Sequence, residues 1–302
     1  MVILEYWKGV LKMQEIKLCE WFDQHWYKIE LDDKKIKYLP SVTTKLNAMP
    51  KPFLARWRGD IGNREADLRL YEAGDKGTRI HYAASILAKD GVVIYNPYNH
   101  SNYTIEDIEK LRNEYEGSEI FILQDQDEMW QVAKFKAWLD EVKPEIAAYD
   151  KTVYDIENNE AGTIDFIFKI ETGFYDVAGS DPFPLEEGYY IVDLKSSKQL
   201  QDEHYLQIAA YTKMAANQIV NEDKIKGALI IHTNALKTKK GIEGLTTKFS
   251  NMKKIEEDYK LYRNVSTIWE RINTNAHPKM IEFPSLITLK EIDNGNSNYN
   301  ED

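Results

Sequence analysis

The chain has 302 residues, with 39 Lys and Arg against 50 Asp and Glu, so its formal net charge at pH 7 is −11. Hydrophobic residues make up 43%, aromatic residues 12% and charged residues 29%, which argues against collagenous, low-complexity and membrane-embedded proteins. The acidic balance argues against a protein that coats nucleic acid nonspecifically, since that requires clustered Lys and Arg. It permits an enzyme with a local basic channel.

The cysteine content limits the cofactors and the compartment. Cys19 is the single cysteine, which excludes an intramolecular disulfide and a zinc or iron–sulfur site on four cysteines of one chain. No apolar run approaches the roughly 20 residues that span a bilayer, so no membrane partner is expected. Residues 1–10 have no basic leader and no small-residue cleavage site. We therefore expect a reducing, cytoplasmic location, and the Lys-, Asn- and Ile-rich usage suggests a bacterial or phage genome.

The N-terminal part predicts a β-hairpin followed by helices. Apolar and polar residues alternate in 25–31 and 36–39 around a polar turn, which is typical of two paired strands. Hydroxyl residues after Pro40 predict the cap of a helix that reaches Leu46, and a second helix is expected after Pro52. One side of this second helix would carry Phe53, Leu54 and Trp57.

Two further helices flank a polar stretch. The first is expected to begin at Gly77 and to end near Asp90. The polar segment 95–126 suits an insertion, such as an arch or lid. The clearest amphipathic helix spans 127–142, before the helix-breaking Pro144. Its apolar positions are Trp130, Ala133, Phe135, Ala137, Trp138, Leu139 and Val142.

The pattern changes to strands between 152 and 233. Residues 163–170 alternate, 189–195 are strongly β-prone, and 228–232 form an apolar run typical of a buried strand. A helix is expected at 203–217, between the last two strands. This order predicts an α/β fold with a central mixed β-sheet flanked by helices, and a right-handed crossover where parallel strands are joined.

Two of these strands carry charged groups that are suited to chemistry. Asp193 and Lys195 are two residues apart in a strand, so they share a face. Asp165 interrupts an apolar alternation, where an unpaired carboxylate would cost several kcal/mol. If the two strands are neighbours, Asp165 and Asp193 converge, and a hard divalent cation is the simplest way to relieve their repulsion. Such an ion beside a lysine indicates hydrolysis of a phosphodiester.

Each of these residues also has a plainer interpretation. A lone Asp-x-Lys on a strand is most often a surface ion pair, although the apolar flanks favour a central strand here. Gln207 and Tyr211 share a helix face next to Lys195, but a buried tyrosine with a satisfied hydroxyl gives the same pattern. His81 taken alone is more often a satisfied histidine than a metal ligand. The arginines after Pro52 either lie on a solvated face or contact phosphate.

Four motifs follow one another along the chain. They are Gly77-Thr-Arg-Ile-His81, Gly162-Thr-Ile-Asp165, Asp193-Leu-Lys195 and Gln207-Ile-Ala-Ala-Tyr211. In this order they resemble the motifs of the PD-(D/E)XK nuclease superfamily, in its RecB-like exonuclease branch. The segments 39–44, 54–57 and 77–81 are similar to mitochondrial genome maintenance exonucleases and related phage exonucleases. The resemblance covers most of the chain and implies a restriction-endonuclease-like core with an N-terminal hairpin and helical elaboration.

The resemblance implies a metal site and a catalytic lysine. The ligands of Mg²⁺ or Mn²⁺ would be Asp165, Asp193, the backbone carbonyl of Leu194 and His81. Lys195 would be the catalytic lysine. Many members have a Glu upstream of the first metal-binding Asp, and Asp150 stands where that Glu is expected. Because Asp150 has the shorter side chain, its contact with the metal is the least secure of the set.

The resemblance also implies contacts with DNA. Gln207 and Tyr211 would support the site or contact DNA near the scissile phosphate. Further candidates for DNA contacts are Arg56, Trp57, Arg58, Arg79 and Ser196. The sequence lacks the four cysteines of the iron–sulfur relatives and the P-loop of the helicase-fused relatives, so neither an iron–sulfur cluster nor a nucleotide cofactor is expected. The expected partners are DNA and a recombination or single-strand-binding protein.

We expect one nuclease domain over 1–302. A hairpin and helices would occupy 1–76, and the nuclease core would occupy 77–290. A long helix at about 250–272 would pack across the sheet, and the polar tail 291–302 would be disordered.

The leading hypothesis is a metal-dependent DNA exonuclease that acts on single-stranded DNA or DNA ends in replication, recombination or repair. Three alternatives remain: an endonuclease on the same core, a catalytically silent DNA-binding module, and a protein unrelated to nucleic acid whose carboxylates form ordinary ion pairs. The intact Asp165, Asp193 and Lys195 argue against the silent module, and the net charge favours the third alternative. The residue pattern does not reveal the polarity of digestion, the strand preference or the preferred metal.

Overall fold

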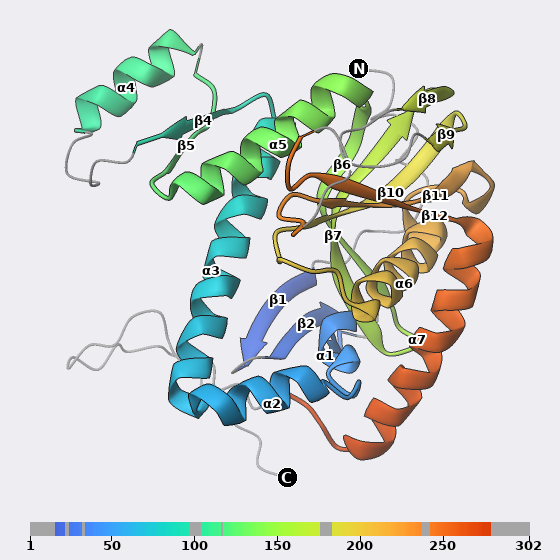
Figure 1. Ribbon diagram of the computed structural model, residues 1–302. Coiled ribbons are helices and arrows are strands. Elements are labelled where there is room, and N and C mark those ends of the chain that lie inside the picture. The colour runs from blue at the N-terminus through green and yellow to red at the C-terminus, as the bar shows by residue number, and fades with distance from the viewer. Residues whose placement is uncertain are drawn as a thin grey trace, which may run out of the picture.

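The computed structural model shows a mixed α/β protein built on a five-stranded sheet (Figure 1). The residues that the structure describes are 16–21, 24–31, 34–96, 104–115, 117–175, 183–236 and 242–278. The expectations for residues 1–10, for part of the segment 95–126 and for the tail 291–302 lie outside these residues. Within the described part of the chain, no helix has the length and apolar character needed to cross a membrane.

The central sheet has the strand order β12-β11-β10-β7-β6. Its strands are β6 (Glu145–Asp155), β7 (Glu160–Ile170), β10 (Gly188–Lys195), β11 (Ile225–His232) and β12 (Thr246–Asn251). β10 and β11 are parallel and are joined through α6 (Asp202–Gln218) and the short helix η3 (Glu222–Lys224), whereas the other neighbours are antiparallel. The expected mixed sheet is confirmed, while β12 and the first half of β6 were not predicted.

Helices cover both faces of this sheet (Figure 1). On one face, α6, α7 (Met252–Ile272) and α1 (Val42–Leu46) pack against residues such as Ile191 and Ile230. On the other, α3 (Asn63–Ala88) and α5 (Gln126–Val142) pack against residues such as Val192 and Ile231. Adjacent residues of one strand thus enter different cores, each contributing about 1.5–3 kcal/mol when fully buried.

The N-terminal residues form a separate three-stranded sheet. Its strands are β1 (Ile16–Trp21), β2 (Gln24–Glu30) and β3 (Ile36–Pro40), in the order β1-β2-β3. The expected hairpin is therefore confirmed as β2 and β3, with Ile29 opposite Lys37, and β1 is an addition. Ser41 caps α1, because its side chain accepts the Thr44 backbone N–H at 2.9 Å, as the hydroxyl pattern predicted.

Of the next two helices, one is confirmed and the start of the other is wrong. A helix does follow Pro52, α2 (Pro52–Ile61), but none of its residues is buried and the Phe53 side chain is 82% exposed. The third helix begins at Asn63 rather than Gly77, because α3 continues for 26 residues through its internal glycines. A glycine inside a helix costs only about 1 kcal/mol, which the packing of α3 on α5 can offset.

The amphipathic helix α5 lies where the sequence placed it, and of its expected apolar positions only Trp130, at 59% exposed, lies away from the core. Phe135 and Trp138 are buried and stack on Phe166 and Phe168 of β7. Between α3 and α5 the chain forms a parallel pair of strands and a helix, and a short hairpin follows β7. These elements are β4 (Val92–Tyr95), α4 (Ile105–Glu114), β5 (Ile120–Leu123), β8 (Gly173–Tyr175) and β9 (Phe183–Leu185).

Candidate active site

The ladder between β7 and β10 ends beside two carboxylates. Val192 is paired with Phe166, and the same register would set Asp193 opposite Asp165 as the next pair. At this point the Asp165 carboxylate accepts the Leu194 backbone N–H at 2.7 Å, so a side chain takes a hydrogen bond where strand pairing stops. The structure thus brings Asp165 and Asp193 to adjacent positions on neighbouring strands.

Helix α3 supplies a histidine to the same place. His81 Nδ1 lies 3.3 Å from Asp165 Oδ1. Gly77 lies one turn earlier on the same face of α3, and a Cβ added there would be 3.2 Å from Ser196 Oγ, the residue after Lys195. Helix α3 therefore passes close to the end of β10 at Gly77, where a side chain would press on the Ser196 hydroxyl.

A hydrogen-bonded chain runs from Asp193 into α6. Lys195 Nζ lies 3.0 Å from Asp193 Oδ1 and 2.7 Å from Oδ2, and it donates to Gln207 Oε1 at 3.2 Å. Gln207 Nε2 in turn donates to the Tyr211 hydroxyl at 3.1 Å. The Tyr211 ring lies over Gly162 of β7, where an added Cβ would collide with the ring. Two of the four sequence motifs thus meet at one ammonium group, and a third contacts them through Gly162 and the Tyr211 ring.

The environment separates the pKa values of the two carboxyl groups. Burial raises the pKa of Asp193 to about 6, with Lys195 opposing this rise. Burial acts in the same direction on Asp165, but His81, Lys195 and the Leu194 N–H together outweigh it and hold the pKa of Asp165 below its usual range. Burial lowers the pKa of His81, yet Asp165 raises it by more, so the net shift is upward. Oppositely perturbed carboxyl groups at one place are typical of catalytic sites.

Three consecutive residues, the last of β11 and the two that follow it, hold the loop after Lys195. Thr233 donates its backbone N–H to the Lys195 carbonyl at 3.0 Å, and Asn234 Nδ2 donates to the Ser196 carbonyl at 3.0 Å. The His232 ring is hydrogen-bonded to the Ser197 carbonyl. These three residues were not predicted from the sequence. Polar residues after an apolar strand parallel to β10 were the available signal, since parallel strands end at one edge.

The donor groups at the site suit a hard divalent cation. Two carboxylates and an imidazole come together here, and Asp193 Oδ2 is buried with no hydrogen bond of good geometry, despite its contact with Lys195. Within the described residues, no group of three or more His, Cys, Asp and Glu side chains is arranged closely enough to form a ready-made metal site. The Leu194 backbone contributes its N–H to Asp165.

Asp150, the expected additional ligand, lies on the neighbouring strand β6. It falls between the pairs Tyr149–Phe166 and Lys151–Ile164, so the register sets it opposite Asp165. Its backbone has a φ of 46°, in the left-handed region, and its side chain is exposed. The structure therefore places Asp150 opposite Asp165, on the strand next to β7. Its exposed carboxylate does not join the buried cluster around Asp193.

The candidate DNA contacts lie in different surroundings. Arg56 is exposed on α2, Trp57 is half-buried, and Arg58 pairs with Asp67 at 2.7 Å. The Arg79 guanidinium bonds Glu128 of α5 through Nε at 3.1 Å, and these hydrogen bonds raise its pKa. Arg79 therefore joins α3 to α5.

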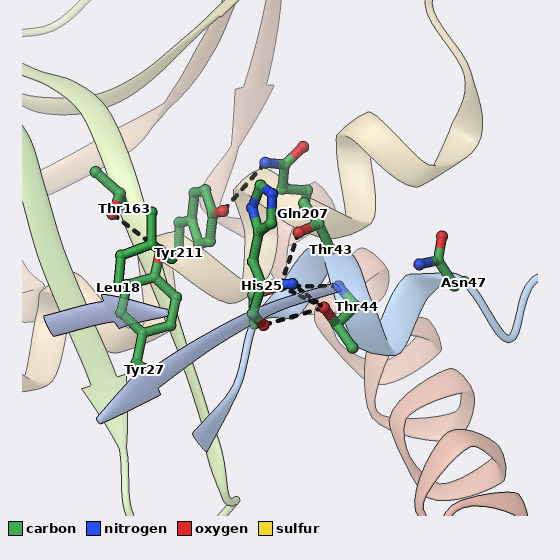
Figure 2. Close-up of a pocket in the computed structure, with 10 residues that line it drawn as sticks. Leu18, His25, Tyr27, Thr43, Thr44, Asn47, Thr163, Gln207 and Tyr211 are labelled. Carbon is green, nitrogen blue, oxygen red and sulfur yellow. Dashed lines mark hydrogen bonds between the residues drawn. The ribbon is translucent and has the colours of Figure 1, made fainter. Parts of the chain in front are cut away.

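A cavity of about 510 Å³ borders the site on the side of the N-terminal sheet (Figure 2). Gln207 and Tyr211 form one wall of this cavity. The opposite wall comes from β1, β2 and the start of α1, including His25, Tyr27 and Thr43. The N-terminal sheet is thereby placed beside the Lys195 chain of hydrogen bonds.

Comparison with known proteins assigns no family to the chain. A scan against protein-family models finds no match, and a search of curated proteins finds none either. The residues of the site and their geometry therefore carry the functional inference.

Proposed function

We propose that this protein is a metal-dependent deoxyribonuclease, an exonuclease that hydrolyses phosphodiester bonds of single-stranded DNA or DNA ends on a restriction-endonuclease-like core. The supporting observation is the junction where β7 and β10 part. There Asp165 and Asp193 occupy adjacent positions and Lys195 contacts Asp193 at 2.7 Å. Paired carboxylates with a fixed lysine are the groups that phosphodiester hydrolysis requires. Replication, recombination or repair is the setting that fits this activity.

The site residues divide the work of hydrolysis. Asp165, Asp193 and His81 would hold Mg²⁺ or Mn²⁺, and the bound ion would polarise a phosphoryl oxygen and lower the pKa of its water. The Lys195 ammonium stabilises negative charge that develops on the phosphoryl group and orients the attacking water. The water oxygen forms a bond to phosphorus, the phosphorus–oxygen bond to the leaving sugar breaks, and the water's proton goes to that sugar oxygen.

Gln207 and Tyr211 act as positioning residues for Lys195. Gln207 accepts one hydrogen bond from the ammonium and donates one to the Tyr211 hydroxyl. The phenol is buried, and burial holds its pKa well above 10, so it stays neutral as an acceptor. This arrangement limits the rotamers that Lys195 can adopt, which is how hydrogen bonds around a catalytic group preorganise it.

The test is digestion of end-labelled linear and of closed circular single-stranded DNA with Mg²⁺ or Mn²⁺, with and without EDTA. We expect loss of linear DNA alone, abolished by EDTA and by Lys195→Ala. The matched control is Lys198→Ala, because Lys198 is an exposed lysine three residues away. Its activity should equal that of the unaltered protein.

The other outcomes separate the alternatives. Cleavage of circles would replace the exonuclease proposal by an endonuclease on the same site. DNA binding without cleavage under either metal would indicate a silent binding module. Neither binding nor cleavage would indicate that Asp165, Asp193 and Lys195 form structural ion pairs only. Undiminished digestion by Lys195→Ala would remove the lysine from the mechanism.

A further inference from the structure

We infer that the cavity beside Gln207 and Tyr211 binds the nucleoside, that is the base and sugar, of the nucleotide next to the scissile phosphate. This inference rests on the proposed function and specifies how its substrate is held. The cavity shares two residues with the Lys195 chain of hydrogen bonds, so a group bound in it is next to the reacting centre. At about 510 Å³ it falls in the usual range of small-molecule sites.

The lining selects for an uncharged group. The ten residues around the cavity include no Asp, Glu, Lys or Arg. A phosphate anion would find no cationic partner there, whereas hydroxyl, amide and aromatic groups suit a base and its sugar. The charged groups Asp165, Asp193 and Lys195 lie outside this lining and next to it. One nucleotide would therefore divide between two regions, with its phosphate at the charged residues and its nucleoside in the cavity.

Aromatic rings are present for stacking against a base. His25 is exposed on β2 and lines the cavity together with Tyr211 and Gln207 (Figure 2). Thr44 fixes the backbone of His25 from both sides, because its Oγ1 accepts the His25 N–H at 3.0 Å and donates to the His25 carbonyl at 3.1 Å. A ring on a fixed backbone binds a base at a low cost in conformational entropy.

A second aromatic residue of the cavity lining, Tyr27, is held in place by a hydrogen bond. The Tyr27 hydroxyl is hydrogen-bonded to Thr163 Oγ1 at 2.9 Å, which ties β2 to β7 two residues before Asp165. The N-terminal sheet is thereby fixed relative to the charged residues. On the rim, Thr43 and Asn47 are exposed and lie one turn apart on the segment around α1, so they can be replaced without disturbing the core.

The experiment measures equilibrium binding without cleavage. A Lys195→Ala protein is titrated against a fluorescent oligothymidylate and against the same oligonucleotide with one abasic residue placed at each position in turn. Binding is followed by fluorescence anisotropy. We expect one position at which removal of the base weakens binding roughly tenfold, as loss of one stacked base does. Because every position is sampled, the scan gives a result for either polarity of digestion.

Variants in the same Lys195→Ala background locate the effect. His25→Ala should lose the penalty at that position, and His25→Phe should keep it, because a phenyl ring still stacks. Asn47→Trp places a large ring on the rim and should reduce binding of the intact oligonucleotide to the abasic level. Its matched control is Asn221→Trp, since Asn221 is equally exposed and lies before η3, away from the cavity.

The outcomes distinguish the two proposals. A uniform effect of base removal at all positions, or a penalty unchanged in His25→Ala, would overturn the nucleoside site even if the unaltered protein hydrolyses DNA. A localised penalty in a protein that never hydrolyses DNA would overturn the proposed function and leave the nucleoside site standing. No binding to any oligonucleotide would overturn both.

Discussion

Two clusters of charged residues each include a carboxylate of the same strand, β7, and they have different roles. We call the first the structural cluster: Lys45, Glu160, Tyr262, Arg263, Ser266 and Glu270. The second is the site cluster: His81, Asp165, Asp193, Lys195, Gln207 and Tyr211. Their β7 carboxylates, Glu160 and Asp165, are five residues apart.

The structural cluster is closed to solvent at its centre. Lys45 Nζ lies within 3.1 Å of four oxygen atoms, on Asn158, Glu160, Ser266 and Glu270, and its side chain is 0% exposed. The Glu160 side chain is also 0% exposed. These contacts join α1, β7 and α7, so the cluster fixes the N-terminal segment to the sheet.

The site cluster is open by contrast. The side chains of His81, Asp165 and Lys195 are 31%, 18% and 15% exposed. Each cluster leaves one buried carboxylate oxygen without a hydrogen bond, Glu160 Oε1 and Asp193 Oδ2, so satisfaction of polar atoms does not separate them. Exposure of the lysine and of the β7 carboxylate does: Lys45 and Glu160 are 0% exposed, although Glu270 and Arg263 of the same cluster are 38% and 28% exposed, whereas Lys195 and Asp165 are 15% and 18% exposed. We conclude that exposure of this central pair is the better guide to which buried ion pair performs chemistry.

The largest expected effect is the loss of hydrolysis in Lys195→Ala. Removal of the ammonium should lower kcat about 10³-fold, within the range of 10²–10⁴ for a positioned catalytic group. The midpoint of urea unfolding should fall less than for a fully buried pair. Lys195 is partly exposed, and Asp193, whose pKa burial raises to about 6, can take up a proton when its partner is removed. Steady-state digestion and urea titration on the same preparation provide both values. A large fall in stability with activity preserved would reassign Lys195 to a structural role.

The opposite pattern is expected for Lys45→Met. Removing one partner of a buried charge pair leaves Glu160 uncompensated and should lower the free energy of unfolding by about 3–5 kcal/mol. Activity per folded molecule at low temperature should stay near normal. Lys51→Met is the control, since its ion pair with Glu203 is partly exposed and should matter little. Equal losses in both variants would contradict the distinction.

Gly162→Ala tests the strand segment between the two clusters. The added Cβ collides with the Tyr211 ring, and such overpacking costs about 1–3 kcal/mol. The displaced ring should also loosen Gln207 and lower kcat. Introducing Tyr211→Leu in addition removes the collision, so the stability losses of the two single variants should not add. Additive losses by urea titration would show that the ring is not the obstacle.

The pH dependence of stability reports on His204, which lies in the first turn of α6 near Lys195. Burial, with Lys195 and His232 nearby, lowers the pKa of His204 from 6.5 to about 3. Its neutral form is therefore favoured on folding. Stability from this group is complete above pH 6.5 and declines towards pH 3, by at most about 1.4 kcal/mol per pH unit.

Comparison with His204→Gln isolates this contribution. Glutamine can still accept the Gln201 N–H that His204 Nδ1 accepts at 3.2 Å. Asp193 has a raised pKa and acts in the opposite sense, so stability curves of the two proteins must be subtracted. The difference should grow as the pH falls below 6.5. A difference that is constant with pH would show that His204 does not titrate as described.

The smallest expected effect concerns the loop after Lys195. Asn234→Ala removes the hydrogen bond to the Ser196 carbonyl, worth about 0.5–1.5 kcal/mol, and should lower kcat roughly 2- to 10-fold with KM unchanged. Asn221→Ala, at an exposed position, is the control. A rise in KM with kcat intact would place Asn234 in substrate binding instead of positioning.

The sequence predicts the elements whose pattern is local. The β2–β3 hairpin, α5, α6 and β10 follow from alternation or helical period and from clear boundaries. The start of α3 was missed because Gly74 and Gly77 resemble a helix boundary, and only the packing against α5 overrides them. The edge strand β12 was missed because its buried residues are hydroxyl residues and its single apolar residue, Phe249, is exposed.

For the site, the sequence predicts which residues share a face within one helix or strand. It does not predict which residues of different elements come into contact. Asp193 and Lys195 share a face by alternation alone. That His81 reaches Asp165 depends on how α3 packs against the end of β10, and that Tyr211 fits over β7 depends on Gly162. Neither contact follows from periodicity. The burial of Lys45 could not be predicted for the same reason, since its partners lie more than a hundred residues away in the sequence.

The hydrogen bond from the Leu194 N–H to the Asp165 carboxylate also supplies a natural reporter. Its 2.7 Å length makes the amide proton sensitive to the charge of its acceptor. In a two-dimensional ¹⁵N–¹H NMR spectrum, the Leu194 amide resonance would shift when the Asp165 carboxylate is protonated or coordinates a cation. The backbone amide of Leu194 thus reports on the charge of Asp165 without an attached probe, at the point where β7 and β10 separate.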